Sequence, residues 1–273
     1  MSDQQHADPP GGIGAPRAAT ETGSAPRAGD APGSLTWADD APGPATGGET
    51  RPSAGLLALV GGAEWQPGAD YDAELLERSG ADEVLVLPTA AAYEHPDRAV
   101  ATARSWFSSL GTSVRGLMVL RHAQANDEAN AAVVRDASFI YLSGGSPLHL
   151  LSVLKGSLVF EALANAWHQG AVVAGSSAGA MVLVDPMVDP RGGAFTVGLG
   201  LVEQLAVVPH HDSGASHHFW RTLELAPAGL PVAGIPERTA LIRDTDGSWR
   251  SAGERPVAIY LDGVEAGLEA LPR

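Results

Sequence analysis

Short, largely apolar runs recur along the chain, and they limit its fold more than any other feature. They lie at residues 56–60, 84–87, 114–120, 139–142 and 171–174. A strand with one face in water alternates apolar and polar residues, so apolar runs without that alternation predict strands buried on both faces. Longer amphipathic segments separate the runs, which indicates helical crossovers between parallel strands. We therefore expect an α/β fold with a doubly wound, mostly parallel sheet flanked by helices.

Turn signals bound these segments. Helices are expected at 70–78, ended by Gly80, at 96–110, between Pro96 and Gly111, and at about 126–135. After residue 236, short β-type runs follow at 239–242, 248–250 and 257–260, with Asp246-Gly247 before the second. Because Asp-Gly between β runs is typical of hairpins, the sequence predicts a small C-terminal antiparallel extension.

The first 53 residues differ in composition from the rest. They hold eight of the 20 prolines and nine of the 33 glycines, with almost no large apolar side chains. Such a segment buries too little apolar surface to offset the entropy lost on ordering. We expect residues 1–53 to be a disordered Pro/Gly/Ala-rich tail and residues 54–273 to form one α/β domain.

Composition also narrows the partners and the chemistry. The formal net charge of -15 argues against nucleic acid or an anionic membrane surface as the main partner. The absence of cysteine excludes disulfides, thiolate metal sites and a cysteine nucleophile. The N-terminus lacks the basic and apolar regions of a signal peptide, and no apolar run is long enough to span a bilayer. We expect a cytoplasmic protein, and leave open whether it is a homo-oligomer.

A serine lies at the sharpest predicted turn of the chain. Residues 175–179 read Gly-Ser-Ser-Ala-Gly, directly after the apolar run 171–174 and before the apolar residues 181–184. This pattern predicts a strand that turns tightly into a helix, with the Ser177 hydroxyl beside free amides of the helix N-terminus. The neighbours must be small because a larger side chain would clash in so tight a turn. Ser177 is therefore the candidate nucleophile.

Two other strand ends, at 61–64 and 143–146, carry small or reactive residues. Ligands of open α/β sheets bind beyond the carboxyl ends of the strands, so we expect these segments to lie beside Ser177 at one edge. Gly144 and Gly145 are candidate oxyanion-hole residues, because glycine allows its N–H to turn toward a developing negative charge. The N–H of Ala178 is the candidate second donor.

A serine hydroxyl becomes nucleophilic when a base removes its proton, and the base is usually histidine. His210 follows the apolar run 205–208 and lies at a strand end, and the adjacent His211 is a weaker candidate for the same role. Four histidines and one aspartate between residues 210 and 218 also raise the question of zinc. Adjacent histidines point in different directions, and the chain has no H-E-x-x-H spacing. We predict no metal and no cofactor.

Six motifs occur in order over most of residues 54–261. They are LLALVGGAE (56–64), VLVLPTA (84–90), FIYLSGGSPLHLL (139–151), GSSAGA (175–180), VPH (208–210) and GIPERTA (234–240). Together they resemble the cyanophycinase / alpha-aspartyl dipeptidase family of serine peptidases. The resemblance implies a flavodoxin-like fold similar to that of class I glutamine amidotransferases, with serine in place of their cysteine. It also implies Ser177 as nucleophile, His210 as its base, and an oxyanion hole of Ala178 with Gly144 or Gly145.

The resemblance offers two carboxylates as the residue that orients the histidine, and it does not decide between them. Glu237, in GIPERTA, matches the cyanophycinase position, whereas Asp185 lies nearer the acid of the aspartyl dipeptidase branch, and Glu237 is favoured. In cyanophycinases an aromatic residue and a cluster of arginines come after the histidine. In this chain Arg221 is the only arginine in residues 211–221. This departure puts cyanophycin in doubt as the substrate. Arg221 is the candidate partner for a carboxylate of a short acidic peptide.

The sequence therefore predicts a serine-type peptidase that hydrolyses small peptides, aspartyl peptides among them, through an acyl-enzyme. Two alternatives stay open: an esterase-type serine hydrolase, and a non-catalytic binding protein with the same fold. A glutamine amidotransferase is disfavoured, because its thioester chemistry needs the cysteine that this chain lacks.

Overall fold

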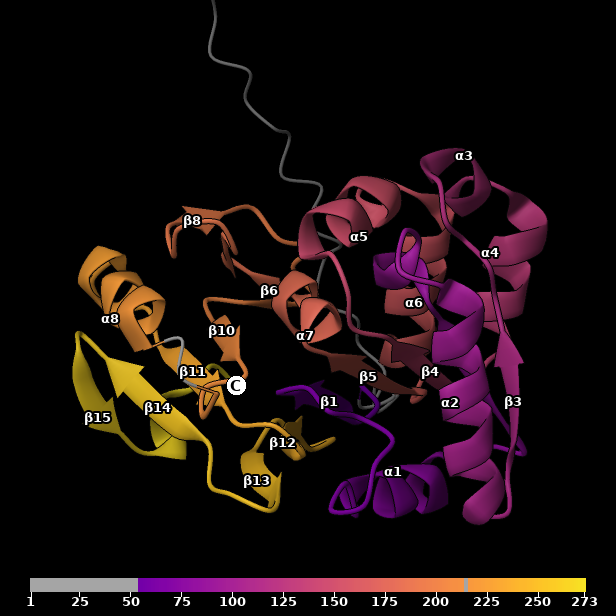
Figure 1. Ribbon diagram of the computed structural model, residues 1–273, viewed down its shortest axis with the longest axis horizontal. Helices are drawn as coiled ribbons and strands as arrows, with labels where there is room; N and C mark the ends of the chain where they lie inside the picture. The colour runs from indigo at the N-terminus through magenta and orange to yellow at the C-terminus, as the bar shows by residue number, and fades with distance from the viewer. Residues whose placement is uncertain (1–53, 214–215) are drawn as a thin grey trace, which may run out of the picture. The chain divides into compact units, whose positions relative to one another are not determined.

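The computed structural model describes residues 54–213 and 216–273, and the side chains of residues 54–213 and 219–273. The tail predicted at residues 1–53 lies outside this described part of the chain. The described residues form a seven-stranded central sheet, a four-stranded second sheet and the helices around them (Figure 1).

The central sheet has the strand order β13-β12-β1-β5-β4-β2-β3. Its strands are β1 Leu57–Val60, β2 Glu83–Leu87, β3 Ser113–Gly116, β4 Phe139–Leu142, β5 Val172–Ser176, β12 Thr239–Arg243 and β13 Trp249–Gly253. The first five of these pair in parallel, whereas β12 is antiparallel to β1 and β13 is antiparallel to β12. The expected doubly wound, mostly parallel fold is confirmed, and so is the hairpin at Asp246-Gly247 between β12 and β13.

Helices cover both faces of the central sheet. They are α1 Tyr71–Ser79, α2 Pro96–Ser109, α3 His122–Ala125, α4 Glu128–Arg135, α5 Pro147–Leu154, α6 Leu158–His168, α7 Ala178–Leu183 and α8 Ser216–Leu225, with short 3-10 turns at η1 Thr89–Ala91 and η2 Leu268–Ala270. Buried residues of α1 and α2 pack on one face, and those of α3 to α7 pack on the other. In these described ranges no single helix is long and apolar enough to cross a bilayer, and α5 with α6 pass such a test only as a pair bent by 92°.

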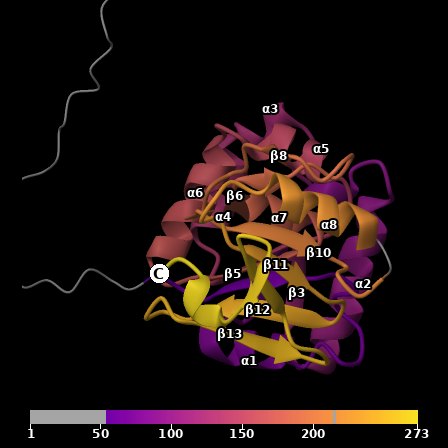
Figure 2. The ribbon, with the colours of Figure 1, turned by 90° about the vertical axis from the view of Figure 1, so that its left-hand side faces the viewer.

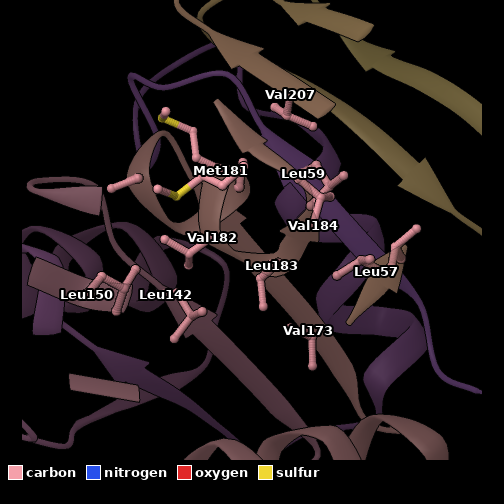
Figure 3. Close-up of a cluster of buried hydrophobic side chains, with 14 of the residues drawn as sticks. Leu57, Leu59, Leu142, Leu150, Val173, Met181, Val182, Leu183, Val184 and Val207 are labelled. Carbon is pink, nitrogen blue, oxygen red and sulfur yellow. The ribbon is translucent and has the colours of Figure 1, made fainter. Parts of the chain in front are cut away.

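The inner strands β1, β2, β4 and β5 are buried on both faces, as the unbroken apolar runs predict, whereas the edge strand β3 is partly exposed. In β1, Leu57 and Leu59 face the core beneath α7, whereas Ala58 and Val60 face the core beneath α1 and α2. Figure 3 shows Leu57 and Leu59 in the first of these cores, beside Val173 of β5 and Leu183 of α7. Full burial of one such Leu or Val side chain stabilises the fold by about 1.5–3 kcal/mol. This packing fixes the strand ends, and with them the site described below.

The second sheet was not expected from the sequence. It contains β10 Ala206–Pro209, β11 Val232–Ile235, β14 Ala258–Leu261 and β15 Val264–Ala266, in the order β10-β11-β14-β15. Helix α8 lies beside this sheet (Figure 2). The two are in contact, since the ring centroid of Phe219 lies 5.2 Å from that of Tyr260 in β14. The C-terminal extension is therefore divided: the hairpin joins the central sheet, and residues 258–266 complete a sheet that begins with β10.

Two predicted elements have different bounds. The strand expected at 114–120 ends at Gly116, where a side chain would lie 2.7 Å from the Val100 side chain. The helix expected at 126–135 is α4, which begins at Glu128 because the Asp127 side chain caps it by accepting a hydrogen bond from the Ala129 N–H at 2.9 Å. The short helix α3, at 122–125, was not expected from the sequence. Short strand pairs lie after α7: β6 Val184–Asp185 with β9 Val202–Glu203, and β7 Met187–Val188 with β8 Phe195–Thr196.

Candidate active site

Ser177 lies between the end of β5 and the start of α7 (Figure 1). Its backbone has φ 48° and ψ -104°, a conformation that costs a non-glycine residue about 1–3 kcal/mol. A side chain on Gly175 would lie 2.6 Å from the backbone of Gly179, and one on Gly179 would lie 2.7 Å from the carbonyl oxygen of Leu142. The glycines of this motif are therefore required by the tight strand-to-helix turn that presents the Ser177 hydroxyl.

Three side chains form a continuous hydrogen-bonded chain. The Nε2 atom of His210 lies 2.9 Å from Ser177 Oγ, and its Nδ1 atom lies 2.9 Å from Glu237 Oε1. Because an ionised carboxylate accepts only, Nδ1 carries a proton and Nε2 is free to accept the serine proton. The side chains of His210 and Glu237 are 39% and 33% exposed, so the arrangement is open to a substrate.

The histidine and the glutamate follow strands of the second sheet, and the histidine is held against the end of β1 in the first. His210 follows β10 with φ 52°, and its N–H donates to the carbonyl of Gly61 at 2.8 Å. A side chain on Gly62 would collide with the His210 ring, so glycine is needed at this close approach. Glu237 follows β11, and its N–H donates to Asp212 Oδ1 at 3.0 Å. The two sheets thus meet at the end of β1.

The structure brings Glu237, and not Asp185, against the histidine. Asp185 lies in β6, and its Oδ1 atom accepts a hydrogen bond from the Gly198 N–H at 2.7 Å. It therefore holds the loop before β9. Of the two carboxylates that the sequence leaves open, Glu237 has the geometry of the orienting acid.

The candidate oxyanion residues lie next to the serine. A side-chain carbon on Gly144 would be 3.5 Å from Ser177 Cβ. Gly145 has φ 137° and packs against the backbone of Ala90. Ala178 is the first residue of α7, where N–H groups have no partner within the helix. Gly144 and Ala178 thus lie beside Ser177, and Gly145 follows Gly144 in the same turn, but the Gly144 N–H donates to Glu64 Oε1 at 3.1 Å.

Glu64 was not assigned a role from the sequence. Besides Gly144, it contacts Ser176, whose hydroxyl donates to Glu64 Oε2 at 2.7 Å. The sequence did contain a signal for Glu64, since this residue ends the GGAE segment (61–64), one of the strand ends expected at this edge of the sheet. Its partners, however, lie 80 and 112 residues away along the chain, and only the fold brings them together.

Two further candidates have other contacts. The Arg221 Nε atom donates to the carbonyl of Gly192 at 2.8 Å, so the structure pairs Arg221 with the loop before β8 and not with the triad. The His211 ring packs edge-on against the Phe219 ring, with the ring centroids 4.4 Å apart. Burial lowers the pKa of His211, and the charge of Asp212 opposes this shift. His211 is thus a packing residue. Among the described side chains, which exclude His217 and His218, no three His, Asp or Glu residues are grouped to hold a metal.

A buried polar cluster lies behind Glu64 and is made of Trp65, Tyr71, Asp72 and Tyr141. In the described structure, Trp65 Nε1, Tyr71 OH, Asp72 Oδ1 and Tyr141 OH have no hydrogen-bond partner. The other oxygen of Asp72 accepts from Trp106 Nε1–H at 2.9 Å. Burial raises the pKa of Asp72 well above its usual range, and the charge of Glu64 adds to this, while the Trp106 bond opposes it. Asp72 therefore holds its proton more tightly in the folded than in the unfolded chain.

This shift predicts a pH-dependent stability that Asp72→Asn removes. The contribution of Asp72 is fully present below its unfolded pKa of about 4 and is lost as the pH rises through its folded pKa. We expect the free energy of unfolding of the variant, relative to wild type, to grow between pH 4.5 and 8, by up to about 1.4 kcal/mol per pH unit. Urea unfolding of both proteins at several pH values measures it. A difference that does not change with pH would show that Asp72 ionises normally.

The fold and the geometry of Ser177, His210 and Glu237 are those of a serine hydrolase. The model of peptidase family S51 matches residues 57–248, and the chain belongs to this family. It is therefore a serine-type peptidase that acts on small peptides, and the resemblance drawn from the sequence motifs is confirmed.

Individual relatives agree with this assignment. The chain is 27% identical over 218 residues to cyanophycinases of Synechococcus elongatus and Thermosynechococcus vestitus, an alignment that covers 75% of this chain and 67% of each relative. A solved peptidase from an acI-B1 Actinobacterium is 30% identical, with a TM-score of 0.71, over 79% of this chain and 94% of that one. A candidate peptidase E protein from Listeria monocytogenes, 18% identical over 76% of this chain and 98% of that one, has a TM-score of 0.55 and shares the fold.

Proposed function

We propose that this protein cleaves small peptides through a covalent acyl-enzyme on Ser177. The observation that carries the proposal is the hydrogen-bonded chain from Ser177 through His210 to Glu237, with both links at 2.9 Å. This is the arrangement of a nucleophile, its general base and the acid that orients the base. The strained turn at Ser177 adds support, because strain of this kind is concentrated at functional sites.

In the acylation step, Ser177 Oγ attacks the carbonyl carbon of the scissile bond, and His210 Nε2 accepts the hydroxyl proton. The Glu237 carboxylate stabilises the imidazolium that forms. Negative charge develops on the carbonyl oxygen, which accepts hydrogen bonds from the Ala178 N–H and from one of the two glycines at 144 and 145. His210 then donates its proton to the departing amine, and the C–N bond breaks.

In the deacylation step, water takes the place of the amine. His210 Nε2 removes a proton from the water as its oxygen attacks the acyl carbon, and the same donors bind the second oxyanion. Collapse of this intermediate returns the proton to Ser177 Oγ and releases the carboxylic acid. The steps need no group beyond the residues named and the water.

We further propose that the preferred substrates are short peptides with an aspartyl residue, and that Arg221 binds the acidic group. Arg221 is exposed, and within the described part of the chain only its Nε atom has a hydrogen-bond partner, the Gly192 carbonyl, so the end of the guanidinium is available for a carboxylate. The proposal is supported by the likeness to cyanophycinases and a peptidase E-type fold.

The experiment is mass-spectrometric turnover of a pool of dipeptides and tripeptides that includes alpha- and beta-linked aspartyl peptides. Wild type, Ser177→Ala and Arg221→Ala are measured in parallel. We expect cleavage by wild type, none by Ser177→Ala, and a roughly tenfold or larger rise in KM for aspartyl peptides alone in Arg221→Ala. Equal rises for neutral and aspartyl peptides would contradict the role of Arg221.

The same pool separates the alternative functions. Hydrolysis of p-nitrophenyl esters without peptide cleavage would identify an esterase. Stoichiometric peptide binding without any turnover would identify a non-catalytic binding protein. Cleavage that persists in Ser177→Ala would overturn the proposed mechanism.

A further inference from the structure

We propose that Glu64 is a positioning residue that fixes the turn at Gly144 and Gly145, so that the Gly145 N–H is the glycine donor to the oxyanion. The inference rests on the proposed function and adds a residue to it. Glu64 follows β1, whereas the turn follows β4 and Ser177 follows β5. A single side chain therefore connects the three strand ends at which the site is built.

Both carboxylate oxygens of Glu64 are used. Oε1 accepts from the Gly144 N–H at 3.1 Å, and Oε2 accepts from the Ser176 hydroxyl at 2.7 Å. Ser176 is fully buried, so its hydroxyl needs an acceptor, and Glu64 supplies it. Because Ser176 directly precedes Ser177, Glu64 sets the distance between the turn and the nucleophile.

The backbone on both sides of Glu64 is strained, and this strained loop sets the direction in which the Glu64 side chain points. Gly62, Ala63 and Trp65 have φ values of 122°, 50° and 58°. Two non-glycine residues in this region cost about 1–3 kcal/mol each, and such strain persists where surrounding contacts over-determine it. One of these contacts is evident, since the Trp65 ring lies 5.1 Å from the Tyr141 ring of β4. The loop at residues 62–65 therefore packs on β4, and it holds Glu64 against the Gly144-Gly145 turn that follows β4.

The turn is held on both sides, which leaves one amide for the substrate. The Gly144 N–H is engaged by Glu64, and the Gly144 carbonyl accepts from the Ser143 hydroxyl at 3.2 Å. That carbonyl belongs to the same peptide group as the Gly145 N–H, so its hydrogen bond fixes and polarises this donor. Within the described residues, no group accepts from the Gly145 N–H. Gly145, with the first amide of α7 at Ala178, is then the donor pair.

The test compares Glu64→Ala, Glu64→Asp and Glu64→Gln with wild type, and uses Glu77→Ala, an exposed glutamate of α1, as the matched control. Alanine removes both contacts, and aspartate keeps the charge but is too short to span them. We expect kcat to fall about 10- to 100-fold in both, with KM nearly unchanged, since a misplaced oxyanion donor acts in the transition state. Glutamine, which keeps the length, is expected to recover most of the loss.

A second readout needs no turnover. A dipeptide boronic acid forms a tetrahedral adduct with an active-site serine, and its dissociation constant, measured by calorimetry, should rise in parallel with the loss of kcat. If Glu64→Ala does not fold, as judged by its thermal melt, Glu64→Asp carries the test. An unchanged kcat would overturn the inference, and so would a rise in kcat, which would make Glu64 a brake on the Gly144 amide. Wild type without turnover and without boronate binding would instead overturn the proposed function.

Discussion

Replacing Ser177 with alanine is expected to lower kcat/KM for peptide cleavage by about 10⁴- to 10⁶-fold. The hydroxyl that lies 2.9 Å from His210 Nε2 is the only atom of this residue that forms a bond with the substrate in the proposed mechanism. Any residual rate would come from water attacking a carbonyl held by the oxyanion donors, a route that retains about 10³- to 10⁴-fold acceleration over solution. Initial rates on a cleaved peptide, with enzyme in excess for the variant, measure the loss.

The fold should survive this change. Alanine takes the same backbone conformation at φ 48°, and the lost hydrogen bond is to a histidine that is 39% exposed. We therefore expect the free energy of unfolding to change by about 1 kcal/mol or less. A variant that melts like wild type yet still cleaves peptides at a tenth of the normal rate or faster would contradict the role of Ser177.

Glu237→Gln is expected to lower kcat by about 10²- to 10⁴-fold, whereas Asp185→Asn should stay close to wild type. Glutamine has the shape of glutamate, but it lacks the charge that stabilises the imidazolium. Its amide can also donate to Nδ1, which favours the tautomer that leaves Nε2 protonated and unable to accept the serine proton. Asparagine at position 185 keeps an oxygen for the Gly198 N–H. Steady-state kinetics of the two variants under identical conditions compare the carboxylates directly.

The pair of variants also provides its own control. Each removes one negative charge without a change in side-chain volume, so a general effect of charge would appear in both. Loss of activity in Asp185→Asn with normal activity in Glu237→Gln would reverse the assignment that the 2.9 Å contact of Glu237 with His210 supports.

The parts of the fold that depend on local patterns could be predicted from the sequence. The apolar runs give the strands of the parallel sheet, and Gly80 ends α1 in the left-handed conformation typical of helix termini. The strand-to-helix turn at Ser177 follows from small residues between apolar segments. These features need only interactions between residues close in the chain.

The parts that depend on long-range pairing could not be predicted. The apolar run at 205–208 predicts the strand β10 before His210. Its pairing with β11, about 26 residues later, forms a sheet that no local pattern indicates. That pairing brings Glu237 to His210 and leaves Asp185 elsewhere. The role of Glu64 depends likewise on the meeting of three strand ends. Sequence motifs therefore pointed to residues that lie beside Ser177 in the structure, and tertiary contacts place Glu237 rather than Asp185 against His210.

The most direct measurement is the position of a covalent adduct after treatment of the full chain with diisopropyl fluorophosphate, read by intact mass and peptide mapping. The proposed mechanism predicts one adduct per chain, on Ser177, and much slower labelling in His210→Ala, because the serine is nucleophilic only with its base in place. A wild-type protein that cleaves peptides but carries its adduct on another residue, or none at all, would contradict the claim that Ser177 forms the acyl-enzyme.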